Sequence, residues 1–140
     1  MCGLDDRGRG TYSAAGITAL AEALKVNAVL TTLNLSDNGI GDEGATAIAD
    51  ALKGNEVLTS LDLRSNGMCG LDDRGRGTYS AAGITALAEA LKVNAVLTTL
   101  KLDDNNIGDE GAVALASALR VNGVLKNLDL GENEIGDEGA

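Results

Sequence analysis

The sequence predicts an α/β fold in which short parallel strands alternate with helices along one right-handed solenoid. Three observations predict this fold. Residues 1–33 recur without a substitution at residues 68–100. A shorter unit of 28 residues, beginning at Leu30, recurs at Leu97. Within each unit the apolar spacing changes from the period of a strand to the period of a helix, so each unit is expected to contain one of each.

The repeats divide the 140 residues into stacked units. One unit is enlarged by an 11-residue insertion, CGLDDRGRGTY, at residues 69–79, and the same segment also occurs at residues 2–12. We expect a single array over residues 1–140, because stacked units share one continuous core. Its parts are a partial unit 1–29, the units 30–57, 58–96 (with the insertion) and 97–124, and a partial unit 125–140.

The first half of each unit has the pattern of a short strand with one buried face. In L-x-x-L-x-L-x-x-N, Leu33 and Leu35 alternate at period two, and Asn38 closes the pattern. The leucines are expected to point into the core, so the residues between them face outward.

The second half of each unit has helical spacing. Ile84, Leu87 and Leu91 fall at i, i+3 and i+7. Acidic and hydroxyl side chains mark the expected helix starts, and asparagines mark the ends, where a left-handed conformation suits the turn to the next strand. The expected N-caps are Asp42, Ser80, Asp109 and Asp137, and the expected ends are Asn27, Asn55, Asn94 and Asn122.

These motifs resemble the leucine-rich repeat family, in its 28-residue ribonuclease-inhibitor-like subclass. The unit LxxLxLxxNxIGDEGAxALAxALxxN is similar to the repeats of NOD-like receptors and of Ran GTPase-activating proteins. The resemblance implies a horseshoe, with parallel strands on the concave face and helices on the convex face. It also implies an asparagine ladder at Asn38, Asn66, Asn105 and Asn133.

Composition excludes several classes of function. The net charge is −10, from 21 acidic and 11 basic residues, and Tyr12 and Tyr79 are the whole aromatic content. Such a chain repels phosphates and offers few rings for base stacking, so we expect no nucleic-acid partner. We also expect no membrane partner and no cofactor. The absence of His removes the commonest general base, so we expect no enzyme. The lack of a signal peptide and the two cysteines predict a cytoplasmic location.

The sequence therefore predicts a protein-interaction module with two candidate surfaces. One is the concave strand face, and the other is the insertion, because loops carry binding functions more often than scaffolds do. The concave candidates are Asn34, Ser36, Asp62, Arg64, Lys101, Asp103 and Asp129. The insertion candidates are Asp72, Asp73, Arg74, Arg76 and Tyr79.

Two alternatives stay open at this stage. One is a regulatory repeat region of the GTPase-activating or NOD-like-receptor type, which the wording of the repeats resembles. The other is nucleotide or metal binding by the DDRGRG loops, although helix capping also explains the acidic pairs. We place Cys2 and Cys69 on the outer loops. Finally, the ends of the array carry no polar capping unit, so we expect either a piece of a longer array or self-association through the uncapped ends.

Overall fold

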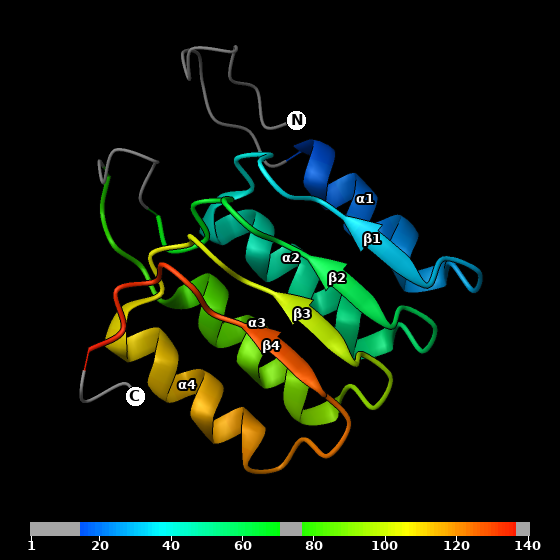
Figure 1. Cartoon of the computed structure of the whole chain (residues 1–140). Coiled ribbons are helices and arrows are strands. Elements are labelled where there is room, and N and C mark those ends of the chain that lie inside the picture. The colour runs from blue at the N-terminus through cyan, green and yellow to red at the C-terminus, as the bar shows by residue number, and fades with distance from the viewer. Residues whose placement is uncertain (1–14, 71–76, 137–140) are drawn as a thin grey trace.

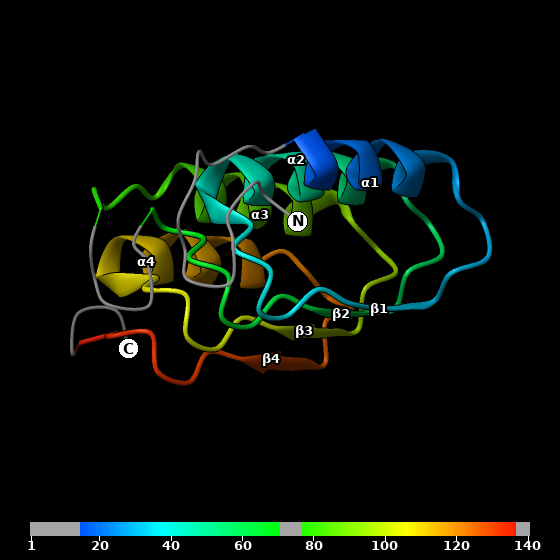
Figure 2. The same cartoon turned by 90° about the horizontal axis from the view of Figure 1, so that it is seen from above.

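The protein folds into two layers, a parallel sheet and a layer of helices packed on one side of it (Figures 1 and 2). A computed structural model describes residues 15–70 and 77–136. The four strands lie side by side in chain order and pair in parallel. The fold class predicted from the sequence is confirmed. The elements are α1 (Ala15–Val26), β1 (Thr32–Asn34), α2 (Gly41–Gly54), β2 (Ser60–Asp62), α3 (Ala82–Val93), β3 (Thr99–Lys101), α4 (Gly108–Leu119) and β4 (Asn127–Asp129).

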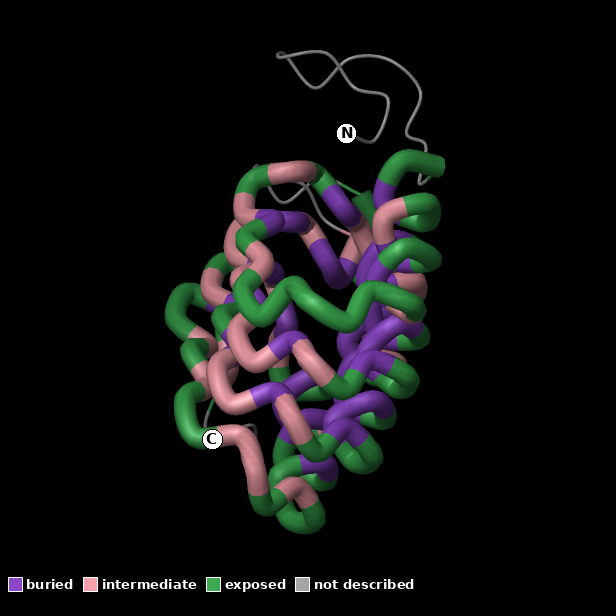
Figure 3. Tube along the Cα trace, turned by 90° about the vertical axis from the view of Figure 1, so that its right-hand side faces the viewer, coloured by how far each residue is buried: buried purple, intermediate pink, exposed green. Residues whose placement is uncertain are grey.

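The core lies between the two layers and is aliphatic (Figure 3). The predicted strand leucines point into it, with Leu61 and Leu100 both 0% exposed. The predicted helical positions Ile84, Leu87 and Leu91 face them and are equally buried. Burying such side chains stabilises the fold by about 1.5–3 kcal/mol each. The shared core is the physical reason that the units stack.

The asparagine ladder is confirmed at Asn66, Asn105 and Asn133 by hydrogen bonds to a neighbouring unit. Among the described residues, the Asn38 side chain bonds only its own turn. Asn105, which is 0% exposed, accepts through Oδ1 from the backbone N–H groups of Asn66 (3.0 Å) and Met68 (3.3 Å) in the preceding unit. Its Nδ2 donates to the Leu63 carbonyl at 2.9 Å. Asn133 makes the same bonds to Asn105 and Ile107. Each amide therefore joins two units through backbone groups that the sheet leaves unpaired.

The asparagines after the helices form a second ladder, which the sequence did not predict. The expected left-handed conformation is wrong, because Asn55 (φ −85°, ψ 124°) and Asn94 (φ −75°, ψ 124°) are extended. Asn94 Nδ2 donates to the Leu52 carbonyl of the preceding unit at 2.8 Å. Its Oδ1 accepts from the N–H groups of Val96 and Leu97 at the start of the next strand segment. The extended conformation leads the chain directly into the strand and turns the amide toward the neighbouring helix end.

The helix starts also differ from the expectation. Asp42 and Asp109 are not N-caps, because α2 and α4 begin one residue earlier, at Gly41 and Gly108, and neither has a side-chain cap. Gly41 has φ +71°, a conformation that glycine adopts without steric cost, and its N–H bonds the Asn66 carbonyl at 2.9 Å. The acidic residues lie in the first turn, where their negative charge interacts favourably with the positive end of the helix dipole. Asp137 lies outside the described residues.

The predicted role of Ser80 is partly met. Its Oγ accepts from the Ala82 N–H, the first of α3, at 3.2 Å, although the residue that precedes the helix directly is Ala81. The start of α3 thus has a side-chain acceptor that α2 and α4 lack.

Candidate protein-interaction surface

The helices leave one face of the sheet uncovered (Figure 1), and polar residues follow one another on that face across all four strands. The register sets Asn34 beside Asp62, Asp62 beside Lys101, and Lys101 beside Asp129. Alternate residues of a strand point to opposite faces, and Leu33 and its counterparts pack against the core. The structure therefore brings these predicted residues into one line on the concave face.

A second polar row lies one step further along the strands. Backbone pairing continues beyond the strand ends, through Leu35 N to Asp62 O (2.8 Å) and Leu63 N to Lys101 O (2.9 Å). This pairing places the predicted residues Ser36, Arg64 and Asp103 next to one another, all half-buried.

Arg64 is held rigidly by Asp62 within this surface. Its Nη2 donates to Asp62 Oδ2 at 2.7 Å, and its Nε donates to both carboxylate oxygens at 2.9 and 3.1 Å. The hydrogen bonds from Arg64 hold the pKa of the Asp62 carboxyl below its ordinary value. A two-pronged pair of this kind fixes the geometry of the guanidinium. Arg64 thus presents a positive charge in a defined position, although its own countercharge is adjacent.

Asp103 has no such partner on β4. At the position that matches Arg64, this strand carries Gly131, and the space beside its Cα is lined by Asp103 Oδ2 and Asp129 Oδ1. Burial, together with the neighbouring Asp129, raises the pKa of the Asp103 carboxyl. Asp103 Oδ1 is buried and accepts no hydrogen bond within the part of the chain that the structure describes. Within the described residues, Asp103 Oδ1 is therefore an unused hydrogen-bond acceptor on this surface, although Arg64, Lys101 and Lys126 lie nearby.

A shallow groove runs between β3 and β4 beside this acidic pair. Lys101 and Asp129 are predicted concave residues, whereas Lys126, which is also exposed in this groove, is not among the predicted residues. The residues equivalent to Lys126 in the other units are Thr31, Thr59 and Thr98. This departure from the repeat is the feature of the sequence that indicates Lys126. The groove is lined by Thr99, Leu100, Lys101, Lys126, Asn127, Leu128 and Asp129.

The insertion is described only at its two ends. Cys69 O accepts from Ser80 N at 2.8 Å, which closes the base of the loop. The Tyr79 hydroxyl donates to the Ile107 carbonyl at 2.6 Å and so ties the insertion to the start of α4. This residue therefore serves the fold as well as lying at the surface. The other predicted loop residues, Asp72, Asp73, Arg74 and Arg76, lie outside the described residues.

The placement of Cys69 on the outer loop is wrong. Cys69 is 0% exposed and belongs to the core beside Met68. Burial raises the pKa of its thiol to about 12. Such a thiol is not a nucleophile at neutral pH. The Cys69 carbonyl accepts from the Ser80 N–H, so Cys69 is bonded within the described part of the fold. Cys2 lies outside the described residues.

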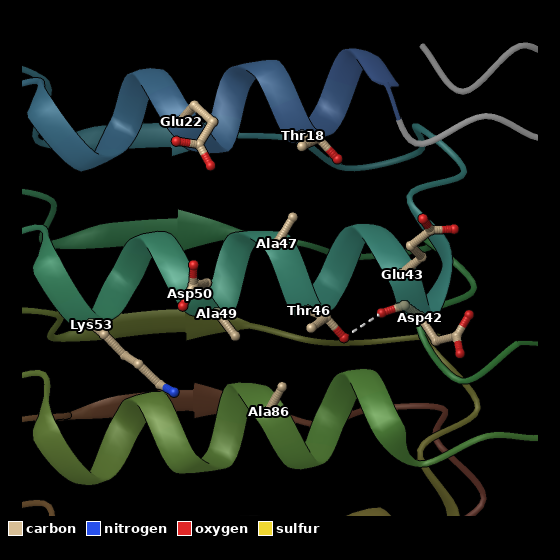
Figure 4. Close-up of a pocket in the computed structure, with 10 residues that line it drawn as sticks. All are labelled: Thr18, Glu22, Asp42, Glu43, Thr46, Ala47, Ala49, Asp50, Lys53 and Ala86. Atoms are coloured by element: carbon tan, nitrogen blue, oxygen red, sulfur yellow. Dashed lines mark hydrogen bonds between the residues drawn. The ribbon is translucent and has the colours of Figure 1, made fainter.

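The convex side carries a second groove that the sequence analysis did not identify (Figure 4). Alanines form its floor and acidic side chains its rim, across α1, α2 and the edge of α3. Lys25 of α1 pairs with Glu22 (2.9 Å) and with Asp50 of α2 (3.1 Å). The groove is lined by Thr18, Glu22, Asp42, Glu43, Thr46, Ala47, Ala49, Asp50, Lys53 and Ala86.

In residues 15–70 and 77–136, no three His, Cys, Asp or Glu side chains are grouped closely enough to hold a metal ion. Within the same ranges, no helix has the length and apolar character to cross a membrane. The DDRGRG segments lie almost wholly outside these ranges, so nucleotide or metal binding there stays a prediction.

The repeated sequence and the repeated strand–helix geometry agree with one family. Its profile, described as Leucine Rich repeat, matches residues 26–49, 54–76, 93–116 and 121–140. This chain belongs to the leucine-rich repeat family. The ribonuclease-inhibitor-like subclass remains a prediction.

Two solved leucine-rich repeat structures resemble this chain. Leiomodin-1 actin-binding site 2 aligns with a TM-score of 0.71 and 29% identity, over 84% of this chain and 63% of that one. The tropomodulin C-terminal domain of Caenorhabditis elegans aligns with a TM-score of 0.68 and 17% identity, over 84% of this chain and 66% of that one, and shows the fold alone. This chain thus spans just under two-thirds of either structure. No curated protein matches it.

Proposed function

We propose that this leucine-rich repeat array is a non-catalytic protein-interaction module that binds its partner on the concave face. Solenoids of this kind present extended concave surfaces for binding. The observation that carries the proposal is the charge pattern of that face. Arg64 forms an ion pair with Asp62, whereas Asp103 and Asp129 lie together and the buried Asp103 Oδ1 accepts no hydrogen bond among the described residues.

The acidic pair indicates which partner group would bind there. A lysine or arginine side chain would donate a hydrogen bond to the buried Asp103 Oδ1 and would place a positive charge beside the two carboxylates. Such a contact, made in a partly desolvated site, adds more to specificity and association rate than to total affinity. We therefore propose a protein partner with a basic segment that lies across β3 and β4.

A charge exchange on this face tests the proposal. The double variant Lys101→Glu, Asp129→Lys reverses two exposed charges on neighbouring strands and leaves the net charge unchanged. The matched control is Lys53→Glu, which reverses an exposed lysine on the convex side. Tagged parent protein is used to capture partners. The double variant should fail to capture the protein that the parent captures, and the control should still capture it. Equal capture by both variants would contradict the concave proposal.

The insertion is the alternative binding surface within the same function. Replacing residues 72, 73, 74 and 76 by serine removes the charges of the loop and spares the structural residues Cys69 and Tyr79. If that variant loses the partner while the double variant keeps it, the loop is the binding surface instead. The regulatory classes that the sequence resembles, and the cytoplasmic location, remain predictions.

Actin is a second candidate partner, favoured by one observation. The matching structure with 29% identity is named as an actin-binding site of leiomodin-1. Co-sedimentation with actin filaments and a fluorescence titration of monomeric actin test this candidate. Binding that is lost in the double variant would identify actin as the partner of the concave face. Absence of binding in both assays would exclude actin as the partner. The proposal of a concave binding face would then be tested by the capture experiment alone.

A further inference from the structure

The internal duplication produces the same surface twice, once inside the array and once at its end. Residues 1–33 and 68–100 are identical, so α1 and the start of β1 have the same side chains as α3 and the start of β3. The pair α3/β3 lies inside the array and packs against α2/β2, whereas α1/β1 lies at one end (Figure 1).

The burial of identical residues differs between the two copies. Leu87, Ala90, Leu97 and Leu100 are all 0% exposed under α2/β2. Their counterparts are open to a greater degree, and Leu30, the counterpart of Leu97, is 38% exposed. The exposed or half-buried copies are Gly16, Leu20, Ala23, Asn27, Leu30 and Leu33.

The opposite end of the array shows the complementary pattern. At the same offset of 67 residues, α4/β4 corresponds to α2/β2, the pair that covers α3/β3. Leu52 is 1% exposed, and its counterpart Leu119 is 42% exposed. The covered residues Leu58, Leu61 and Leu63 correspond to three half-buried leucines, Leu125, Leu128 and Leu130. Each of these pairs has the same residue type.

We propose that a second copy of this chain docks its α1/β1 end onto the α4/β4 end of the first, head to tail, and thereby recreates the contact between α2/β2 and α3/β3. Both apolar faces of that contact are present in matching residues. The contact would bury several leucines together. Burying apolar surface stabilises an association by about 25 cal/mol for each Å² removed from water.

The backbone groups of the two ends also match. Inside the array, Thr98 N and Thr99 N both donate to Thr59 O, at 2.9 and 3.0 Å. In the docked pair, Thr31 and Thr32 would donate to the Lys126 carbonyl of the other copy in the same way. Such pairing would extend the parallel sheet across the two copies, since the edge of a sheet is a template for another strand.

Asn27 is already oriented for the second ladder. Its Oδ1 accepts from Val29 N (3.0 Å) and Leu30 N (2.7 Å), the same bonds that orient Asn94. Asn94 then donates to the Leu52 carbonyl. In the docked pair, Asn27 would donate to the carbonyl of Leu119, the counterpart of Leu52.

The two docking faces are different, and this determines the type of assembly. A contact between two unlike faces leaves one face of each kind free in the dimer. Each added copy can therefore bind a further copy. The mean mass is therefore expected to rise continuously with protein concentration. A net charge of −10 per copy opposes the contact, so added salt is expected to strengthen it.

Sedimentation equilibrium and light scattering test the proposal with two complementary variants of the 140-residue chain. Leu20→Glu places a carboxylate in the α1/β1 face, and Leu119→Glu places one in the α4/β4 face. Each change is expected to weaken self-association by about tenfold or more, because the carboxylate would be buried without a partner. The matched controls are Thr18→Glu and Val113→Glu, whose positions are exposed and correspond to the exposed Thr85 of α3 and Thr46 of α2.

Mixing the two variants distinguishes head-to-tail docking from other associations. Leu20→Glu retains a functional α4/β4 face, and Leu119→Glu retains a functional α1/β1 face. Each variant alone should remain monomeric, and the mixture should give 1:1 dimers that do not grow further. Both controls should associate like the parent chain.

Gly16→Ala is a milder second test in case a glutamate prevents folding. A Cβ on Gly83, its counterpart, would lie 2.7 Å from the Asp42 carbonyl and 2.9 Å from the Ala45 Cβ. The extra methyl should therefore weaken association while circular dichroism stays unchanged. A strictly monomeric parent chain up to millimolar concentration, a closed dimer that either variant still forms alone, or full association of Gly16→Ala would each overturn the proposal.

Discussion

Replacing Asn105 by alanine removes the side chain that joins the two central units most directly. Three backbone groups of the preceding unit would lose their partner, namely Asn66 N–H, Met68 N–H and the Leu63 carbonyl. Each unsatisfied buried group costs about 1–1.5 kcal/mol at the lower end of the usual range, so we expect a loss of about 3–5 kcal/mol in the free energy of unfolding. That is a large fraction of the stability of a small domain.

The same substitution at Asn38 is the matched control. Within the described residues, its side chain bonds only the Leu35 and Ser36 carbonyls of its own turn, at 2.9 and 3.1 Å. We expect Asn38→Ala to cost about 1 kcal/mol. Urea unfolding followed by circular dichroism measures both values, with comparable slopes as the condition for comparing them. If the two variants lose the same stability within about 0.5 kcal/mol, the ladder does not couple the units and the reasoning is wrong.

Three further predictions concern packing, reactivity and pH. Gly83→Ala should destabilise the fold, because its methyl would meet α2, whereas Gly16→Ala should be neutral or stabilising in the monomer, as thermal unfolding will show. In a variant with no other cysteine, Cys69 should react with a thiol reagent at pH 8 only as fast as the protein unfolds, because its pKa is about 12 and it is buried. Because the pKa of Asp62 is lowered in the folded state, its ionised carboxylate stabilises the fold at pH values above the ordinary pKa of 3.8. This stabilisation is lost as the pH falls through the pKa of the folded state. Asp62→Asn should therefore flatten acid unfolding relative to the parent chain, and an unchanged profile would show that the pair with Arg64 contributes little.

The predicted elements agree with the structure wherever a local period determines them. Leu33 and Leu35 alternate as strand residues, and Ile84, Leu87 and Leu91 follow helical spacing, so each set forms one face that packs against the core. The same alternation puts the concave residues on one face, and the register of the sheet then sets Asp62 beside Lys101.

The errors arose where one residue type suits two local structures. Asparagine tolerates the left-handed conformation, but Asn55 and Asn94 are extended because their amides bond the preceding unit. Aspartate is a good N-cap, yet Asp42 lies inside the first turn because Gly41 makes the bond to the neighbouring unit. These choices depend on bonds to residues 25 or more positions away in the sequence, which a local pattern does not contain.

Repetition alone determined that the chain forms a solenoid, since no single strand–helix unit can bury both of its apolar faces. The tertiary structure decided what each copy of a repeated residue contacts. Leu20 and Leu87 have identical neighbours in sequence, but only Leu87 is covered by the helix of an adjacent unit. Likewise, the sequence places Cys69 in a loop, whereas in the structure it is buried and its carbonyl accepts a hydrogen bond from Ser80 N–H. Burial is a property of the stack, and for that reason the same sequence has a covered surface at residues 82–100 and a more open one at residues 15–33.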